Sequence, residues 1–204
     1  MTTVRLPIFP LAGAILFPGL QLPLHIFEPR YRELVGSALA RDRRIAMIQP
    51  HNMSEGAPLF AIGCVGRIDD VEALEDGRYN IVLEGEARFR LVREIPAPTA
   101  YRQIEAELLV EPEDEALSAV ERAALEDEAR RFADRQSYSV DWDSVARLDD
   151  VALVNGMSQI APFDTAAKQA LLEAPDLPTR CALLVQLMEF FGRGDPEEDR
   201  VTLQ

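Results

Sequence analysis

The hydrophobic pattern divides the chain into two parts that differ in period. In the first part, short runs of β-branched and aromatic residues alternate with Pro and Gly, which predicts β-strands. We expect eight of them, at 4–9, 14–17, 21–27, 44–48, 59–71, 79–84, 87–95 and 102–110. Many short strands at this spacing favour a closed or nearly closed barrel.

Two turns are predicted within this strand-rich part. In YNIVLEGEARFRLV, two apolar runs flank Gly85 and Glu86, which predicts a β-hairpin. Arginines alternate with apolar residues over 88–91, so one face should be buried and the other wet. The Asp76-Gly77 pair just before the first run predicts a further turn.

One helix is expected among the strands, near residues 29–41. Pro29 suits a first helical position. Apolar residues then recur at helical spacing, at Tyr31, Leu34, Val35, Ala38 and Leu39. The chain should therefore pass from a strand directly into this helix.

The apolar pattern takes a helical period after Pro112. One apolar stripe runs over 117–133 on an otherwise charged segment, and further helices fit 143–160, 165–174 and 177–191. Asp164 and Asp176 are candidate N-caps. We therefore expect an α+β protein with a β-rich subdomain over 1–112 and an acidic helical subdomain over 113–204, frayed after 192.

The charge distribution argues against nucleic-acid binding. The net charge is −14, with −3 over residues 1–112 and −11 over 113–204. Such a surface repels phosphate backbones unless a basic patch overrides it. The one dense cluster, Arg41, Arg43 and Arg44, is explained by a helix end, where cations are favoured. We expect no nucleic-acid partner.

Composition also bears on the compartment. No stretch reaches the roughly 18 apolar residues needed to cross a bilayer, and prolines interrupt the apolar N-terminal segment, which argues against a signal peptide. Cys64 and Cys181 are expected to be buried, inert thiols. These features predict a cytoplasmic protein without a membrane partner.

The sequence lacks the motifs of common catalytic chemistry. Lys168 is the only lysine and follows no glycine-rich loop, so a Walker ATPase is excluded, and it supports no Ser-Lys dyad. The glycines in GCVG, residues 63–66, are read as a strand bulge. The spacing of His and Cys residues matches no zinc pattern. We expect no catalytic residue, cofactor or metal.

The stretch LPLHIFEPRYREL, residues 22–34, is the strongest candidate for local chemistry. His25, Glu28 and Arg30 could form a pocket for acid-base work or for a small ligand. The alternative is structural: Glu28 caps the helix that begins at Pro29 and pairs with Arg30 or Arg32. Because no nucleophile or metal partner accompanies these residues, we favour the structural interpretation.

Four blocks of the sequence resemble the Lon N-terminal, or Lon substrate-binding, domain family. The opening LPIFPLAGAILFPGLQLPLHIFEPRYRELV is the most similar, and GCVGRI, DGRYNIVLEGEARFRL and KQALLEAPDLPTRCALL follow in the family's order. The resemblance implies a PUA-like β-barrel followed by a helical bundle. It also implies a stand-alone member, since the family's ATPase and Ser-Lys protease modules have no counterpart here.

What the resemblance implies for function is polypeptide binding without catalysis. The expected partner is an unfolded or degron-bearing polypeptide, or one dedicated protein, in quality control or as an adaptor. Apolar side chains of the barrel are the candidate contacts, namely Leu16, Phe17, Pro18, Leu20, His25, Phe27 and Tyr31. The alternatives are the His25 pocket and RNA binding, since PUA-like folds elsewhere bind RNA. The oligomeric state is not predicted.

Overall fold

The computed structural model describes residues 3–54, 56–110, 112 and 116–192. These residues fall into two compact units. Residues up to 112 and Asn155–Glu173 form the first, whereas 116–154 and 174–192 form the second. We expected everything after residue 112 to belong to one helical part. The structure instead groups residues 155–173 with the strands.

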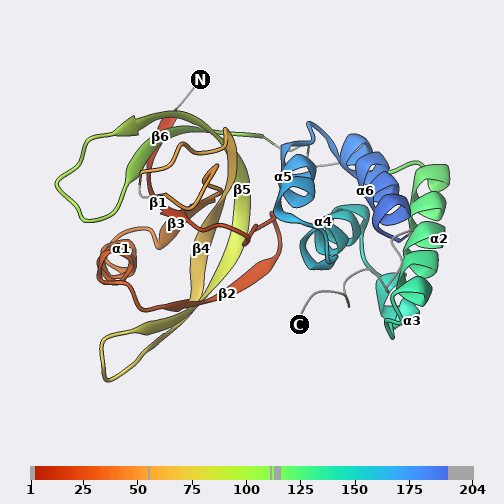
Figure 1. The fold of residues 1–204 in the computed structure, drawn as a ribbon, viewed down its shortest axis with the longest axis horizontal. Helices are drawn as coiled ribbons and strands as arrows, with labels where there is room; N and C mark the ends of the chain where they lie inside the picture. Colours follow the sequence, from red (N-terminus) through yellow and green to blue (C-terminus); the bar gives the residue numbers. More distant parts are fainter. Residues whose placement is uncertain (1–2, 55, 111, 113–115, 193–204) are drawn as a thin grey trace, which may run out of the picture. The chain divides into compact units, whose positions relative to one another are not determined.

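The first unit is built on one six-stranded sheet with the order β2-β5-β4-β3-β1-β6. An additional pairing between β5 and β6 closes the sheet, which confirms the expected barrel. Among the strands that the structure describes, only β1 and β3 pair in parallel. Figure 1 shows the strands β1 (Thr3–Pro10), β2 (Gln21–Ile26), β3 (Arg44–Ile48), β4 (Ile62–Ala73), β5 (Tyr79–Ile95) and β6 (Gln103–Leu108).

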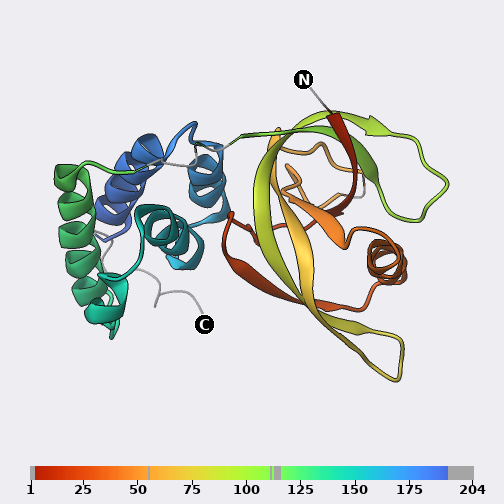
Figure 2. The same cartoon turned by 180° about the vertical axis from the view of Figure 1, so that it is seen from behind.

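Helix α1 (Pro29–Leu39) lies beside the sheet and completes part of its core (Figures 1 and 2). Its buried face consists of Tyr31, Leu34, Val35 and Ala38. Alternate residues of β3 enter different clusters, because side chains of a strand point to opposite faces. Ile45 and Met47 pack with α1 in a first cluster, whereas Ala46 and Ile48 belong to a second.

The strand expected at 14–17 does not form. The segment is irregular, although Ile15, Leu16 and Phe17 are buried. Its backbone groups bond to side chains instead of a neighbouring strand. The Gln49 amide donates to the carbonyl of Ala14, and Phe17 N–H donates to Gln159 Oε1. The apolar pattern of this segment reflects burial in the core. Because no described strand pairs with the segment, the prediction of a strand was wrong.

The hairpin expected at Gly85 is also absent, because β5 continues through this position as one strand of 17 residues. Gly85 is needed for a close approach of backbone. Its N–H donates to Leu20 O at 2.8 Å, and its carbonyl accepts from Gly19 N–H at 2.9 Å. A Cβ at this position would lie 2.2 Å from Phe17 O.

The other two predictions about glycines in the barrel are confirmed. Gly77 has φ of +79° and lies in the turn between β4 and β5, where its N–H donates to Leu74 O. The register between β4 and β5 shifts at Val65/Gly66, which is the bulge expected in GCVG.

Arg88 is the clearest departure from the expected wet face of β5. Its side chain is only 3% exposed, and its Nη1 donates to Leu172 O at 2.9 Å. Leu172 lies in helix α5 (Thr165–Glu173), which belongs to the same unit. Helix α5, which lies late in the chain, therefore covers a face of β5. The alternation of arginines and apolar residues had predicted that this face is exposed to solvent.

Five helices lie after residue 118, namely α2 (Ala119–Arg135), α3 (Trp142–Val145), α4 (Asp150–Ile160), α5 and α6 (Leu177–Phe191), within the described part of the chain. The single helix expected at 143–160 is two helices, α3 and α4. Asp141 caps α3, and Asp149 accepts from Ala152 N–H at the start of α4. The N-cap prediction at Asp176 is confirmed by its bond from Thr179 N–H, and Asp164 accepts from Ala167 N–H.

The core of the second unit forms between α2 and α6, which pack against each other. The stripe expected on α2 supplies Leu125, Ala129, Phe132 and Ala133. Cys181 of α6 is 2% exposed, and burial raises the pKa of its thiol to about 11. The thiol is therefore protonated and unreactive at neutral pH. Cys64 is also buried.

Candidate functional site

A groove of about 660 Å³ lies in the first unit where four segments meet. These segments are the end of β1, the first turn of α1, the loop 50–60 and the loop 96–102. Phe9 and Tyr31 belong to the first core cluster and form the apolar floor, with ring centroids 4.2 Å apart. Leu11, Met53 and Ala57 extend this apolar lining.

Met53 is the most exposed side chain of the groove that is large and apolar. It is 85% exposed and lies in the loop 50–60. A methionine here is unbranched and polarisable, so its side chain can adapt to partners of different shape. A solvated apolar side chain beside a preformed apolar floor offers surface that a bound chain would remove from water.

The charged residues of the groove are already paired. Arg30 and Glu28 form an ion pair at 2.8 Å. Arg102 donates through Nε and Nη2 to the two carboxylate oxygens of Glu94, and its Nη1 donates to Ala57 O at 3.2 Å. The groove thus presents no uncompensated charge from its described lining, and its recognition chemistry is mainly apolar.

The outer edge of Tyr31 adds a polar feature to the floor. The Arg30 guanidinium lies 4.7 Å from the Tyr31 ring centroid. Burial raises the pKa of the Tyr31 hydroxyl, and the neighbouring Glu28 carboxylate adds to the shift against the effect of Arg30. The hydroxyl is therefore neutral at pH 7 and is able to donate a hydrogen bond to a ligand.

Glu28 plays a different structural role from the one expected. It occupies the N-cap position of α1 with an extended backbone, but its side chain makes no capping hydrogen bond. Its carboxylate instead pairs with Arg30, and its backbone carbonyl accepts from Tyr31 N–H and Arg32 N–H. The expected pairing with Arg30 is present, and the expected side-chain cap is not.

The structure does not gather the candidate contact residues into one surface. Leu16 and Phe17 are at most 1% exposed and belong to the interior. Pro18 and Leu20 are half-buried, and Leu20 O is bonded to Gly85. Tyr31, although 8% exposed, is the one candidate that lines the groove.

His25 and Phe27 are exposed, but they lie outside the groove. Phe27 is 61% exposed and stacks on His25, with ring centroids 6.3 Å apart. His25 Nδ1 is 2.7 Å from Asn80 Oδ1, in a separate shallow hollow. Because Glu28 and Arg30 line the groove instead, the structure does not unite the three residues of the alternative acid-base pocket.

Sequence reasoning missed most of the residues that line the groove. Phe9 was expected only as the end of the strand at 4–9, and no role was expected for Leu11 or Ala57. The one available signal was Met53, a lone large apolar side chain in the polar stretch HNMSEG. The convergence of the four segments is a tertiary feature that local pattern does not reveal.

Lys168 has a defined hydrogen-bond partner in the first unit. Its Nζ donates to Gln159 O at 2.7 Å, at the end of α4. Burial lowers the pKa of this lysine. Within the described ranges, no three His, Cys, Asp or Glu side chains gather to hold a metal ion. Among the described helices, none is both long and apolar enough to cross a bilayer.

Comparison with solved structures identifies the fold. The N-terminal domain of Mycobacterium avium complex Lon protease matches with a TM-score of 0.69 and 21% identity, over 91% of this chain and 98% of that one. The Lon N-terminal domain protein from Xanthomonas campestris matches with a TM-score of 0.70 and 22% identity, over 90% and 98%. These likenesses confirm the expected α+β fold, a Lon-type barrel with C-terminal helices.

Curated proteins of similar sequence are much longer than this chain. The Lon protease of Salinispora arenicola is 30% identical over 184 residues, and Lon protease 1 of Syntrophobacter fumaroxidans is 29% identical over 182. The matches cover 88% and 84% of this chain but only 23% and 22% of those proteins. The model of the ATP-dependent protease La (LON) substrate-binding domain matches residues 5–189. The chain therefore belongs to the Lon substrate-binding domain family.

Proposed function

We propose that this protein is a non-enzymatic module that binds apolar segments of unfolded or degron-bearing polypeptides in the groove beside α1. The observation that carries the proposal is Met53, which is 85% exposed and lines the same groove as Phe9 and Tyr31. Membership in a family named for substrate binding supports the same class of ligand. The paired charges of the rim favour apolar contact over recognition of a charged motif.

The physical mode of binding is the insertion of side chains into a preformed groove. Addition of a strand to β2 is disfavoured, because β2 contains Pro23, which lacks an N–H, and because Gln159 Nε2 bonds to Gln21 O. A groove of this size takes only a few side chains, so each contact should be weak and transient. Such binding suits a cytoplasmic adaptor or a quality-control protein that samples many clients.

Substitution of Met53 tests this proposal directly. We would measure fluorescence anisotropy of a labelled, uncharged apolar peptide with the whole chain and without nucleotide. Met53→Ser should weaken binding about tenfold, since burial of a methionine contributes roughly 1.5–3 kcal/mol. Because Met53 is exposed, the substitution should leave the fold intact, and circular dichroism would check this.

The matched control is Val110→Ser, which changes an apolar side chain that is 93% exposed and does not line the groove. This variant should bind the peptide as the unmodified protein does. Equal affinity of all three proteins for the peptide would contradict the assignment of the groove. Absence of peptide binding in the unmodified protein would contradict polypeptide recognition itself.

A further inference from the structure

A second cavity, of about 780 Å³, opens elsewhere in the first unit and shares no lining residue with the groove. Residues of β1, β3, β4, β5 and β6 line it. Leu6 and Val65 belong to the second core cluster, and Val4 and Leu108 pack against that cluster. Leu6 and Val65 are at most 3% exposed, whereas Val4 and Leu108 are half-buried, so Val4 and Leu108 form the part of the apolar wall that a ligand can reach. The volume of the cavity is typical of small-molecule sites.

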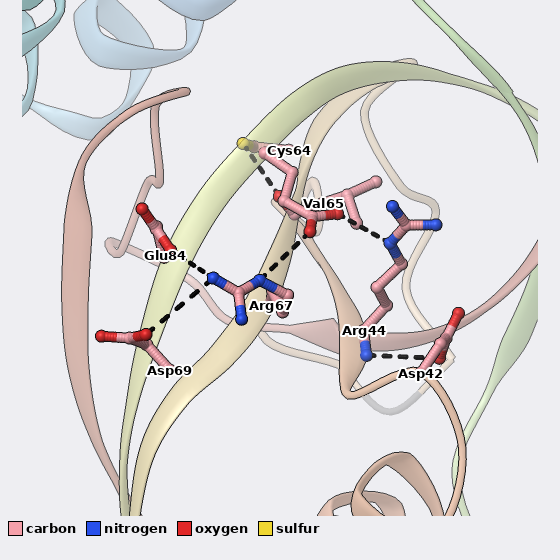
Figure 3. A network of polar contacts seen from close by, with 8 residues as sticks. Asp42, Arg44, Cys64, Val65, Arg67, Asp69 and Glu84 are labelled. Carbon is pink, nitrogen blue, oxygen red and sulfur yellow. Dashed lines mark hydrogen bonds and ion pairs between the residues drawn. The ribbon is translucent and has the colours of Figure 1, made fainter.

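A network of ion pairs fixes the charged side of this cavity. Glu86 bridges two arginines, with Oε2 2.7 Å from Arg44 Nε and Oε1 3.4 Å from Arg67 Nε. Arg67 Nη2 also lies 2.7 Å from Glu84 Oε2 and 3.9 Å from Asp69 Oδ1. Figure 3 shows the Arg67 guanidinium directed toward Glu84 and Asp69. Arg67 is therefore committed to carboxylates of the protein.

The side chains of Arg44 and Arg5 differ from that of Arg67, because each forms its hydrogen bond through Nε alone. Arg44 Nε bonds to Glu86 at 2.7 Å, and Arg5 Nε bonds to Gln103 Oε1 at 2.8 Å. Within the described residues, the terminal nitrogens of both side chains have no acceptor. Figure 3 shows these two nitrogens of Arg44 without a contact to the residues drawn.

The contrast with Arg102 shows what is unusual about these two arginines. Arg102 engages all three of its guanidinium nitrogens, two with Glu94 and one with Ala57 O. Arg44 and Arg5 instead have their stems fixed and their donors available beside the same apolar wall. A guanidinium with free terminal donors is a planar fork that matches a carboxylate.

We propose that this cavity binds a carboxylate that carries a single negative charge and is attached to a short apolar body. The Arg5 and Arg44 guanidinium groups hold the anion, and the apolar wall at Val4 and Leu108 holds the apolar part. Asp42, Glu84 and Glu86 also line the cavity. Their negative charge disfavours a doubly charged group such as a phosphate monoester.

Two sources could supply this ligand, namely a small organic acid or the C-terminus of a polypeptide. Hexanoate is the first probe, followed in amide NMR spectra of the ¹⁵N-labelled whole chain. We expect saturable shifts at Leu6, Val65 and Gly85, which line the cavity or contribute to its wall. Hexanamide, which lacks the charge, and hexyl phosphate should bind at least about tenfold more weakly.

Substitution of the two arginines tests the same site. Arg5→Gln with Arg44→Gln should weaken hexanoate binding more than about tenfold, since hydrogen bonds to charged groups are lost. Arg30→Gln is the matched control: both Arg30 and Arg44 are 42% exposed and paired with a glutamate, but Arg30 lines the groove. If the double variant does not fold, Arg5→Gln alone should still weaken binding several-fold.

The results that would contradict the carboxylate site differ from the results that would identify its ligand. Equal shifts with hexanoate and hexanamide, or equal affinity of the arginine variants and the unmodified protein, would overturn the carboxylate site. A short apolar peptide with a free C-terminus, compared with its C-terminal amide, identifies the source. Binding of the free-acid peptide alone supports capture of a polypeptide end, and binding of hexanoate alone supports a small acid. Both results are read from the shifts at Leu6, Val65 and Gly85, which do not line the groove, so peptide binding at Met53 does not affect them.

Discussion

Gly85 illustrates how one backbone position can join two parts of the barrel unit. It lies inside β5 and exchanges hydrogen bonds with Gly19 and Leu20 of the preceding irregular segment. The carbonyl of Phe17 occupies the space where a side chain would start. The position therefore requires glycine for close packing, not for a turn.

We expect Gly85→Ala to destabilise the protein by about 1–3 kcal/mol, the range for forced overpacking. The reason is that its Cβ would lie 2.2 Å from Phe17 O, and backbone cannot yield as a side-chain end can. Urea unfolding followed by circular dichroism would measure the change. Gly36→Ala is the control, since Gly36 lies in α1 with open space around it. That variant should gain about 0.5–1 kcal/mol, and a comparable loss in both would refute the packing argument.

At the scale of single residues, the sequence predicted the chemical role of a side chain better than it predicted the burial and the contacts of that side chain. The absence of a phosphate loop and the inert character of Cys181 followed from residue type and spacing, and the raised pKa of Cys181 confirms the latter. The burial of Arg88 was not predictable, because α5 that covers it lies more than 70 residues later in the chain. Met53 was visible in the sequence only as an isolated apolar residue.

At the scale of secondary-structure elements, local signals determined the helices more reliably than the strands. Helix α6 has the predicted bounds, since Asp176 caps its start and Pro178 follows within the first turn. The predicted strands at 79–84 and 87–95 are one element, because Gly-Glu in the middle of β5 resembles a turn. Pairing partners decide whether such a pattern turns or continues, and they are distant in sequence.

Helices α1 and α2 begin with different capping interactions, so removal of the N-cap side chain should lower the stability of the protein by different amounts. Ser118 and Glu121 form a reciprocal capping box at α2, and the bond from Ser118 lowers the pKa of Glu121. Ser118→Ala should therefore cost about 0.5–2 kcal/mol. Glu28→Ala at α1 should cost less than about 1 kcal/mol, since Glu28 makes no capping bond and its pair with Arg30 is solvated.

Thermal unfolding of the two variants, followed by circular dichroism, would compare these losses directly. Glu28→Gln provides the control that keeps the side-chain volume and removes the charge. A larger loss for Glu28→Ala than for Ser118→Ala would show that Glu28 stabilises α1 through an interaction other than its pair with Arg30. It would also revive the capping role first expected for this residue.

At the scale of the whole molecule, charge and apolar recognition are separated along the chain. Most of the net charge of −14 comes from residues after 112, whereas the described charges of the groove form neutral pairs. On our proposal, long-range attraction of a peptide depends on the charge of the whole chain, whereas contact depends on the groove. The two contributions respond differently to salt, because screening acts on separated charges and leaves apolar burial intact.

This separation predicts how the protein should discriminate between two apolar peptides of matched hydrophobicity and opposite charge. At low salt the cationic peptide should bind several-fold more tightly, because the negative field raises its local concentration. At about 1 M salt, where the screening length is roughly 3 Å, the two affinities should converge. Anisotropy titrations at both salt concentrations, without nucleotide, would measure this difference in affinity.

Met53→Ser should weaken the binding of both peptides equally at either salt concentration, since the substitution removes only apolar contact. A preference for the cationic peptide that persists at high salt would instead place acidic side chains in the binding site itself, and would contradict the neutral groove as the point of contact.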